Sequence, residues 1–129
     1  MDREKYINDK KKLFSKHLKK LDETKVELAK DIINNLAFQS CALEELMQIT
    51  IRTGFIEEYK NGANQYGTKQ SSYVATYNKI MTTYNQTAKQ FVALFAKDEK
   101  EELQKDLEFG QFIGKAKSIK RWAILLNNT

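Results

Sequence analysis

The sequence contains no proline, and its five glycines stand at positions 54, 62, 67, 110 and 114. Because proline breaks helices and glycine weakens them, a chain with this distribution can form long uninterrupted helices. Over most of its length, apolar residues recur every three or four positions, which is the spacing of a helix with one buried face. These features predict an all-α protein.

The spacing divides the 129 residues into successive parts. We expect one helical domain over residues 1–109, because a chain of this length fits one domain. Its parts are a basic N-terminal helix at about 9–36, a long antiparallel helical hairpin at about 41–97 and a short acidic helix at about 98–109. Residues 110–129 are predicted to form a basic and apolar C-terminal tail.

Two of these boundaries rest on particular residues. Asn34 and Asn35 weaken the helical pattern and mark the predicted end of the first helix. The first helix of the hairpin is expected to run from Leu43 through Gly54, with Tyr59 as its furthest end. The second is expected to cover residues 73–97.

The turn of the hairpin falls within residues 61–72. Asn61-Gly62 and Gly67 supply residues that favour turns, because they tolerate positive φ angles. An Asn-Gly pair could equally form a tiny β-hairpin at the tip, with residues 65–66 and 68–69 as its strands. Either structure reverses the chain.

The second helix of the hairpin carries the most regular apolar pattern. Its members follow one another at intervals of three or four, close to a coiled-coil seam: Tyr73, Tyr77, Met81, Tyr84, Ala88, Phe91 and Phe95. One hairpin has too little core to be stable alone, so the N-terminal helix or another chain must supply the rest. We predict a homo-oligomer whose interface uses Tyr73, Tyr77, Met81, Tyr84 and Phe91.

No pattern for catalysis or metal binding is present. The chain has one histidine, His17, and one cysteine, Cys41, and lacks a phosphate-binding glycine loop. A zinc site cannot be assembled from one residue of each type. His17 fits a solvated helix position better than a phosphate contact, and Cys41 fits a small buried side chain. We therefore predict no catalytic residues, no metal, no cofactor and no enzymatic activity.

Charge alternates in blocks along the chain. The net charge is +5 for residues 1–20, −4 for 21–60, +4 for 61–97, −4 for 98–109 and +4 for 110–129. Such blocks suit surfaces that pair with one another or with other subunits, leaving basic faces for a polyanion. Ordinary solvated helix faces explain the same pattern equally well.

The N-terminal block predicts a nucleic-acid site. Its lysines surround an apolar stripe, as in a helix that packs on protein and offers cations to a phosphate backbone. The candidate DNA-binding residues are Lys10, Lys11, Lys12, Lys16, Lys19 and Lys20. A basic amphipathic helix could also lie on a membrane surface.

The tail offers a second candidate surface. Lys120, Arg121 and Trp122 suit a partner-docking site, with the tryptophan as an anchor, although burial of Trp122 against its own domain is an equal alternative. No run of about 18 apolar residues occurs, so we expect no membrane span. A single cysteine suits a reducing cytoplasm.

Residues 54–91 resemble the central segment of bacteriophage terminase small subunits, a family of DNA-packaging proteins. The likeness lies in an Asn-Gly…Asn-Gln-x-Gly…Lys-x-Ser linker before a Tyr-Asn helix. It is carried by Asn61, Gly62, Asn64, Gln65, Gly67, Lys69, Ser71, Tyr77, Asn78 and Tyr84.

The resemblance implies a non-catalytic subunit that assembles into a ring in the cytoplasm of the bacterial host. It implies binding to double-stranded viral DNA and to the large terminase subunit, which carries the ATPase and nuclease. In this setting, segment 61–72 would contact a neighbouring subunit, or would contact DNA through Gln65, Tyr66 and Lys69. The alternative function is a helical structural or adaptor protein that self-assembles and binds protein only.

Overall fold

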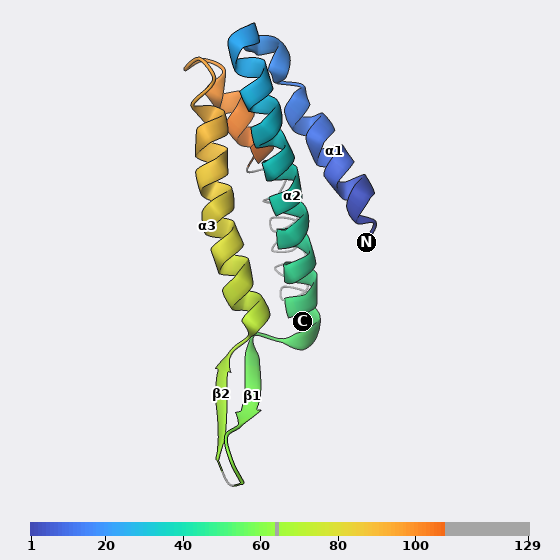
Figure 1. The fold of residues 1–129 in the computed structure, drawn as a ribbon, viewed down its shortest axis with the longest axis vertical. Helices are drawn as coiled ribbons and strands as arrows, with labels where there is room; N and C mark the ends of the chain where they lie inside the picture. The colour runs from blue at the N-terminus through green and yellow to red at the C-terminus, as the bar shows by residue number, and fades with distance from the viewer. Residues whose placement is uncertain (64, 108–129) are drawn as a thin grey trace, which may run out of the picture.

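The computed structural model describes residues 1–63 and 65–107, and this part of the chain is mostly helical with a small antiparallel sheet (Figure 1). The elements in order are α1 (Arg3–Ser15), a 3₁₀ turn η1 (Leu18–Lys20), α2 (Glu23–Thr53), β1 (Ile56–Lys60), β2 (Tyr66–Gln70) and α3 (Ser72–Val92). Residues 100–107 are also helical. The predicted helical character is confirmed.

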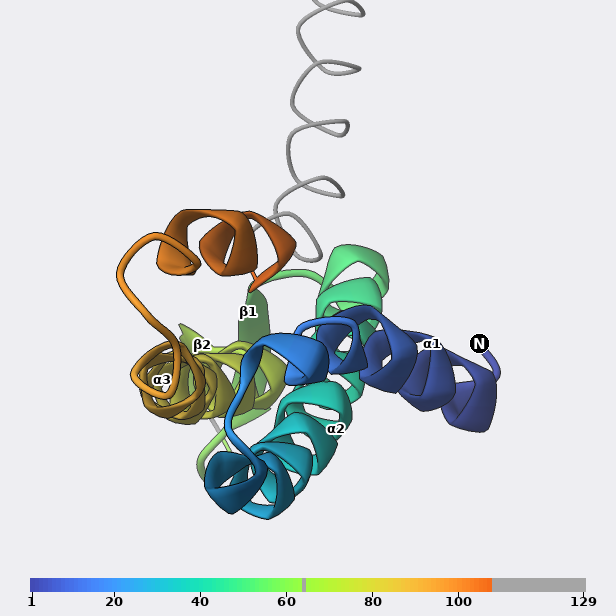
Figure 2. The same ribbon diagram turned by 90° about the horizontal axis from the view of Figure 1, so that it is seen from above.

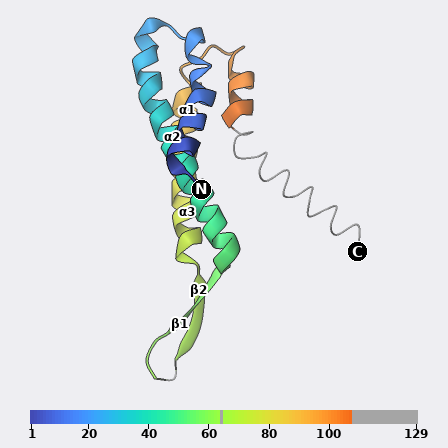
Figure 3. The same cartoon turned by 90° about the vertical axis from the view of Figure 1, so that its right-hand side faces the viewer.

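The helices α2 and α3 lie side by side and run in opposite directions, joined by the sheet (Figure 1). Seen along the long axis, α1 packs against α2 (Figure 2). The strands β1 and β2 extend beyond the helices at one end of the molecule (Figure 3). An antiparallel helical hairpin with a β-hairpin at its tip is therefore the central feature of the fold.

The first helix break lies earlier than the sequence predicted. Instead of one helix over 9–36 and a new start near 41, α1 ends at Ser15 and α2 runs without interruption from Glu23 to Thr53. Asn34 and Asn35 are exposed, whereas the residues that follow them are buried. Burial of one helix face outweighs the weak helix propensity of two exposed asparagines, which is why the predicted break is wrong.

The first helix of the hairpin also ends earlier than Tyr59. Gly54 adopts a φ of 91° and its N–H donates to the carbonyl oxygen of Thr50 at 2.7 Å, closing α2. Only glycine adopts this conformation without strain, so it is the stop signal of the helix. The prediction allowed the helix to extend as far as Tyr59, but residues 56–60 form a β-strand instead.

The β-hairpin is longer than the predicted strands of two residues each. The strands pair in register from Ile56 opposite Gln70 to Lys60 opposite Tyr66. Gly62 has a φ of 86° in the connecting loop, as expected of an Asn-Gly turn. Opposite Tyr59, Gly67 lies under the aromatic ring, and a Cβ atom there would approach the ring to 2.6 Å. Any larger residue would therefore require the exposed Tyr59 ring to move, so glycine is what lets the ring pack closely across the strands.

The second helix of the hairpin is shorter than the predicted 73–97. It ends at Val92, after which tight turns bring Phe95 back onto the helix bundle through hydrogen bonds from Leu94 N to Phe91 O and from Phe95 N to Val92 O, both 3.1 Å. At the other end, the Ser71 hydroxyl accepts from the N–H of Tyr73 at 3.2 Å. Serine is among the residues preferred at this position.

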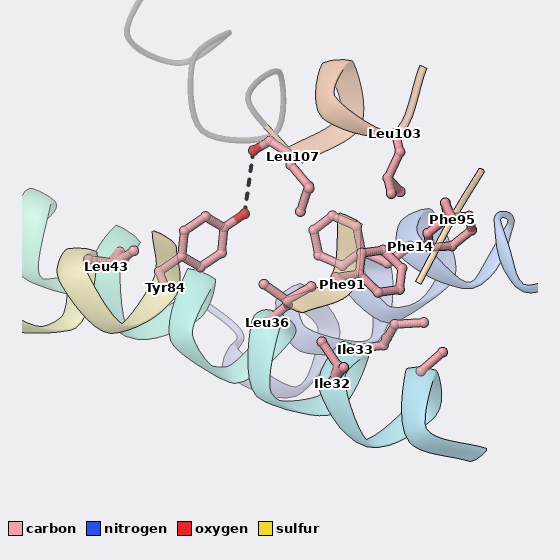
Figure 4. Packing of buried hydrophobic residues seen from close by; sticks show 11 residues of the cluster. Phe14, Ile32, Ile33, Leu36, Leu43, Tyr84, Phe91, Phe95, Leu103 and Leu107 are labelled. Atoms are coloured by element: carbon pink, nitrogen blue, oxygen red, sulfur yellow. Dashed lines mark hydrogen bonds between the residues drawn. The ribbon is translucent and has the colours of Figure 1, made fainter. Parts of the chain in front are cut away.

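The hydrophobic core lies at the end of the bundle away from the β-hairpin. Phe91 contacts Phe14 and Phe95 edge to face, with ring centroids 6.2 and 5.2 Å apart. Leu103 is fully buried, so the helical residues 100–107 contribute to the core as well (Figure 4). The buried cluster comprises Phe14, Ala29, Ile32, Ile33, Leu36, Leu43, Tyr84, Phe91, Phe95, Leu103 and Leu107.

Replacing Phe14 by alanine should lower the free energy of unfolding by about 3–5 kcal/mol, because it removes a fully buried ring and leaves a cavity. Leu28→Ala is the matched control, since Leu28 is 54% exposed on α2. The measurement is urea unfolding followed by circular dichroism. Equal effects of the two substitutions would contradict the assignment of Phe14 to the core.

Candidate nucleic-acid interface

The outer face of α1 carries a stripe of exposed lysines. Lys5, Lys12 and Lys16 are separated by seven and four residues, which places them on one side of the helix, opposite buried Phe14. Lys19 extends the stripe into η1 and is also exposed. We name these four residues, Lys5, Lys12, Lys16 and Lys19, the lysine stripe.

The stripe is held by a helix with a defined start. The Asp2 side chain accepts a hydrogen bond from the N–H of Lys5 at 3.1 Å, capping α1. Arg3 forms an ion pair with Glu45 of α2, which fixes this end of α1 against the bundle. Within the described residues, none of the four lysines of the stripe has an ion-pair partner. Their charges are therefore not neutralised by an ion pair, and the one acid between Lys5 and Lys12 on this face is the exposed Asp9.

The six lysines predicted from the sequence divide into two groups. Lys12, Lys16 and Lys19 belong to the stripe, whereas Lys10, Lys11 and Lys20 are half-buried. Two members of the second group have protein partners. The Lys10 Nζ atom lies 5.7 Å from the centre of the Tyr6 ring, and the Lys20 Nζ atom lies 3.0 Å from Glu102.

The partly buried position of Lys10 affects its charge. Burial lowers the pKa of Lys10, and the nearby Glu44 carboxylate opposes that change. Because the Lys10 ammonium lies over the Tyr6 ring and burial disfavours its charged form, Lys10 is less available to a phosphate than a fully exposed lysine. The structure therefore favours Lys12, Lys16 and Lys19 over Lys10 and Lys20.

Lys5 was missed by the sequence argument. The predicted helix began near residue 9, so Lys5 was left outside it, while α1 in fact begins at Arg3. The signal was present in the sequence: Asp2 with Glu4 marks a helix start, and the interval of seven to Lys12 marks a shared face.

His17 is buried, which contradicts the solvated position predicted for it. Its side chain meets the Asp106 carboxylate, with 2.6 Å between Nε2 and Oδ2, and its ring packs edge to face on Phe95. These contacts attach the helical residues 100–107 to η1. Cys41 is buried as a free thiol, as predicted. Neither residue lies on the lysine stripe.

The β-hairpin was the alternative DNA contact. Gln65 and Tyr66 are exposed, and the Lys60 Nζ atom lies 5.5 Å from the centre of the Tyr66 ring. Lys69 pairs with Glu57 at 3.8 Å. Two acids, Glu57 and Glu58, share β1 with these groups. The hairpin is therefore less cationic than the lysine stripe.

The residues predicted at an interface between chains lie at different depths. Tyr84 and Phe91 belong to the core of the chain, with 4% and 0% of their surface exposed. Tyr77 and Met81 are half-buried, and Tyr73 is 40% exposed. An interface formed by the folded chain would therefore have to use Tyr73, Tyr77 and Met81. Lys120, Arg121 and Trp122 lie outside the described residues.

Comparison with protein-family models, curated proteins and solved structures finds no match to this chain. Over residues 1–63 and 65–107, no group of three or more His, Cys, Asp or Glu side chains is placed to hold a metal ion. No helix in this part of the chain combines the length and apolar character needed to cross a membrane.

The junction between hairpin and α3 depends on the ionised Glu57. Its carboxylate accepts from both the N–H and the hydroxyl of Ser72 at 2.9 Å, and these bonds, together with Lys69, lower the pKa of Glu57 below its usual 4.5. A carboxylate whose pKa is lower in the folded state than in the unfolded state stabilises the fold at pH values above its unfolded pKa. That contribution to stability is lost as the pH falls through its folded pKa. The difference in melting temperature between the natural chain and Glu57→Gln should therefore be present at neutral pH and shrink below about pH 4.5.

Thermal unfolding of both proteins across this pH range, followed by circular dichroism, is the measurement. Glu58→Gln is the matched control, because Glu58 is the adjacent exposed acid of β1. If both substitutions had the same pH dependence, the Ser72 contact would have no specific role.

Proposed function

We propose that this chain is a small terminase subunit, an oligomeric helical protein that binds double-stranded viral DNA in the bacterial cytoplasm. In this role it recruits and regulates the large terminase subunit, which supplies the ATPase and nuclease, so the chain itself has no catalytic task. The observation that carries the proposal is the lysine stripe on α1, and the resemblance of residues 54–91 supports it.

The stripe suits contact with a phosphate backbone. From Lys5 to Lys16 it extends about 17 Å along the helix axis at 1.5 Å per residue. Duplex DNA carries one negative charge per about 1.7 Å of its axis, so a row of this length faces several phosphates. Such contacts give affinity and orientation without reading the base sequence. Recognition of a packaging start site would require additional contacts.

The resemblance adds the biological setting. Asn61 and Gly62 belong to the loop of the β-hairpin, and Ser71 caps α3, so these residues of the resembling segment have structural roles in the chain reversal. The exposed lysines of α1 are the strongest cationic candidate among the described residues.

Replacing Lys12 and Lys16 together by glutamate should weaken binding to duplex DNA roughly tenfold or more at about 50 mM salt, because two phosphate contacts are replaced by repulsion. The slope of log affinity against log salt concentration should also fall in magnitude by about two. Fluorescence anisotropy of a labelled duplex over a series of salt concentrations measures both quantities.

Lys79→Glu with Lys97→Glu is the control, because it makes the same change in net charge at exposed lysines away from α1. Equal loss of binding in both double variants would show a general charge effect and reject the stripe. Full binding after the Lys12 and Lys16 changes would move the site to the basic residues of segment 115–121. No binding of the natural protein at low salt, with a stable oligomer present, would favour the adaptor function.

A further inference from the structure

An apolar groove lies where α2 and α3 approach the β-hairpin. It has a volume of about 280 Å³ and is lined by Met47, Thr50, Ile51, Phe55, Val74, Tyr77 and Asn78. Two of its side chains are unusually exposed for their type, with 71% of Ile51 and 67% of Phe55 accessible. Exposed apolar side chains gathered around a hollow are a candidate binding surface, unlike single exposed ones scattered over a protein.

A second exposed apolar side chain lies elsewhere on α2. Phe38 is 66% exposed. It precedes Ile51 by 13 residues, so the two lie about 20 Å apart along the helix axis and point about 140° apart around it. A two-fold contact would bring the same patch of each chain together. Two apolar features facing different directions suit a head-to-tail contact instead.

Opposite charges lie on the helix faces that carry the two features. Glu27 and Asp31 are exposed and precede Phe38 by eleven and seven residues, which places all three on one face of α2. Glu27 also forms an exposed pair with Lys30 at 3.3 Å. On α3, Lys89 follows Asn78 of the groove by eleven residues, so it lies on the same face and is exposed. Residues 61–97 contain no acid.

The two spacings match. The intervals from Phe38 to Glu27 and from Asn78 to Lys89 are each eleven residues, or about 17 Å of helix. Because α2 and α3 are antiparallel, both intervals run in the same direction, away from the β-hairpin (Figure 1). Consider a neighbouring chain that points the same way and has its Phe38 at the level of the first chain's groove. Its Glu27 then lies at the level of the first chain's Lys89.

We infer that Phe38 of one copy of this chain seats in the apolar groove of a second copy. Each chain then offers one groove and one phenylalanine, about 20 Å apart along the long axis. Each parallel neighbour is displaced by that distance, so the contact repeats as an open filament. The inference deepens the proposed function, because it names the surface by which the proposed subunit would self-associate. It makes no use of DNA.

The test is size-exclusion chromatography with light scattering in the absence of DNA. The natural chain should have a mass of several subunits. Ile51→Asp and Phe38→Asp should each give a monomer of 15.0 kDa. An equimolar mixture of the two variants should form a dimer and nothing larger, because one intact groove and one intact phenylalanine remain. Leu28→Asp, at an exposed apolar residue of the same helix, should leave the assembly unchanged.

Three results would overturn the inference: a monomeric natural chain, an assembled Phe38→Asp variant, or a mixture that stays monomeric. Circular dichroism verifies that the variants fold. Charge reversal gives an independent measurement: Lys89→Glu should weaken assembly, and adding Glu27→Lys in the same chain should restore it, whereas failure of the restoration would reject the register.

The two proposals can fail separately. If the masses of the natural chain and the variants differ from those predicted, while DNA binding remains and depends on salt, only the proposed interface is rejected. Assembly as predicted without any DNA binding at low salt would reject only the proposed function.

Discussion

The packing of Phe91 between Phe14 and Phe95 is the contact on which the rest of the structure depends. It joins α1 to α3 and brings the chain after α3 back onto the bundle. Edge-to-face pairs contribute about 0.5–1.5 kcal/mol each beyond the burial of their surface. Since α2 supplies Leu36 to the same cluster, three helices that would be marginal alone share one core.

A polar layer closes the core on the side of residues 100–107. The buried His17 side chain meets Asp106, and Lys20 pairs with Glu102 near the surface. The Tyr84 hydroxyl donates to the Leu107 carbonyl oxygen at 3.4 Å (Figure 4). A buried polar group is costly unless it is paired, so these contacts specify where the acidic segment lies. The opposite charges of the N-terminal and acidic blocks thus meet, in part, within one chain.

The sequence predicted what depends on local pattern. The apolar repeat of α3 and the turn at Asn61-Gly62 follow from periodicity and residue type. The prediction of a break at Asn34 was wrong because a local propensity of about half a kcal/mol cannot show that the opposite helix face is buried. Residues 56–60 were misplaced for a similar reason: Glu57 and Glu58 are common in helices, and the pairing of β1 with β2 is not visible in either strand alone.

The spacing of residues along the sequence cannot predict contacts between distant segments. A single histidine in a lysine-rich stretch gives no sign that Asp106, 89 residues later, lies beside it. For the candidate site, residue type identified a basic helix, but the distinction between Lys10 and Lys12 required the position of Tyr6 and the true start of α1. Exposure of Phe38 follows from helical spacing once the buried face of α2 is known, because Phe38 lies about 200° around the helix from buried Leu36.

The β-hairpin has a structural consequence beyond its own two strands. The groove is formed by residues on both sides of it, with Phe55 just after Gly54 and Val74 just after the capped start of α3. The positive φ of Gly54 sets the direction in which the chain leaves α2, and the bonds from Ser72 to Glu57 attach β1 to the first turn of α3. The hairpin therefore fixes the separation of the two helix ends that line the groove. Core residues at one end determine the fold, and the hairpin at the other end determines the shape of the surface proposed to receive Phe38.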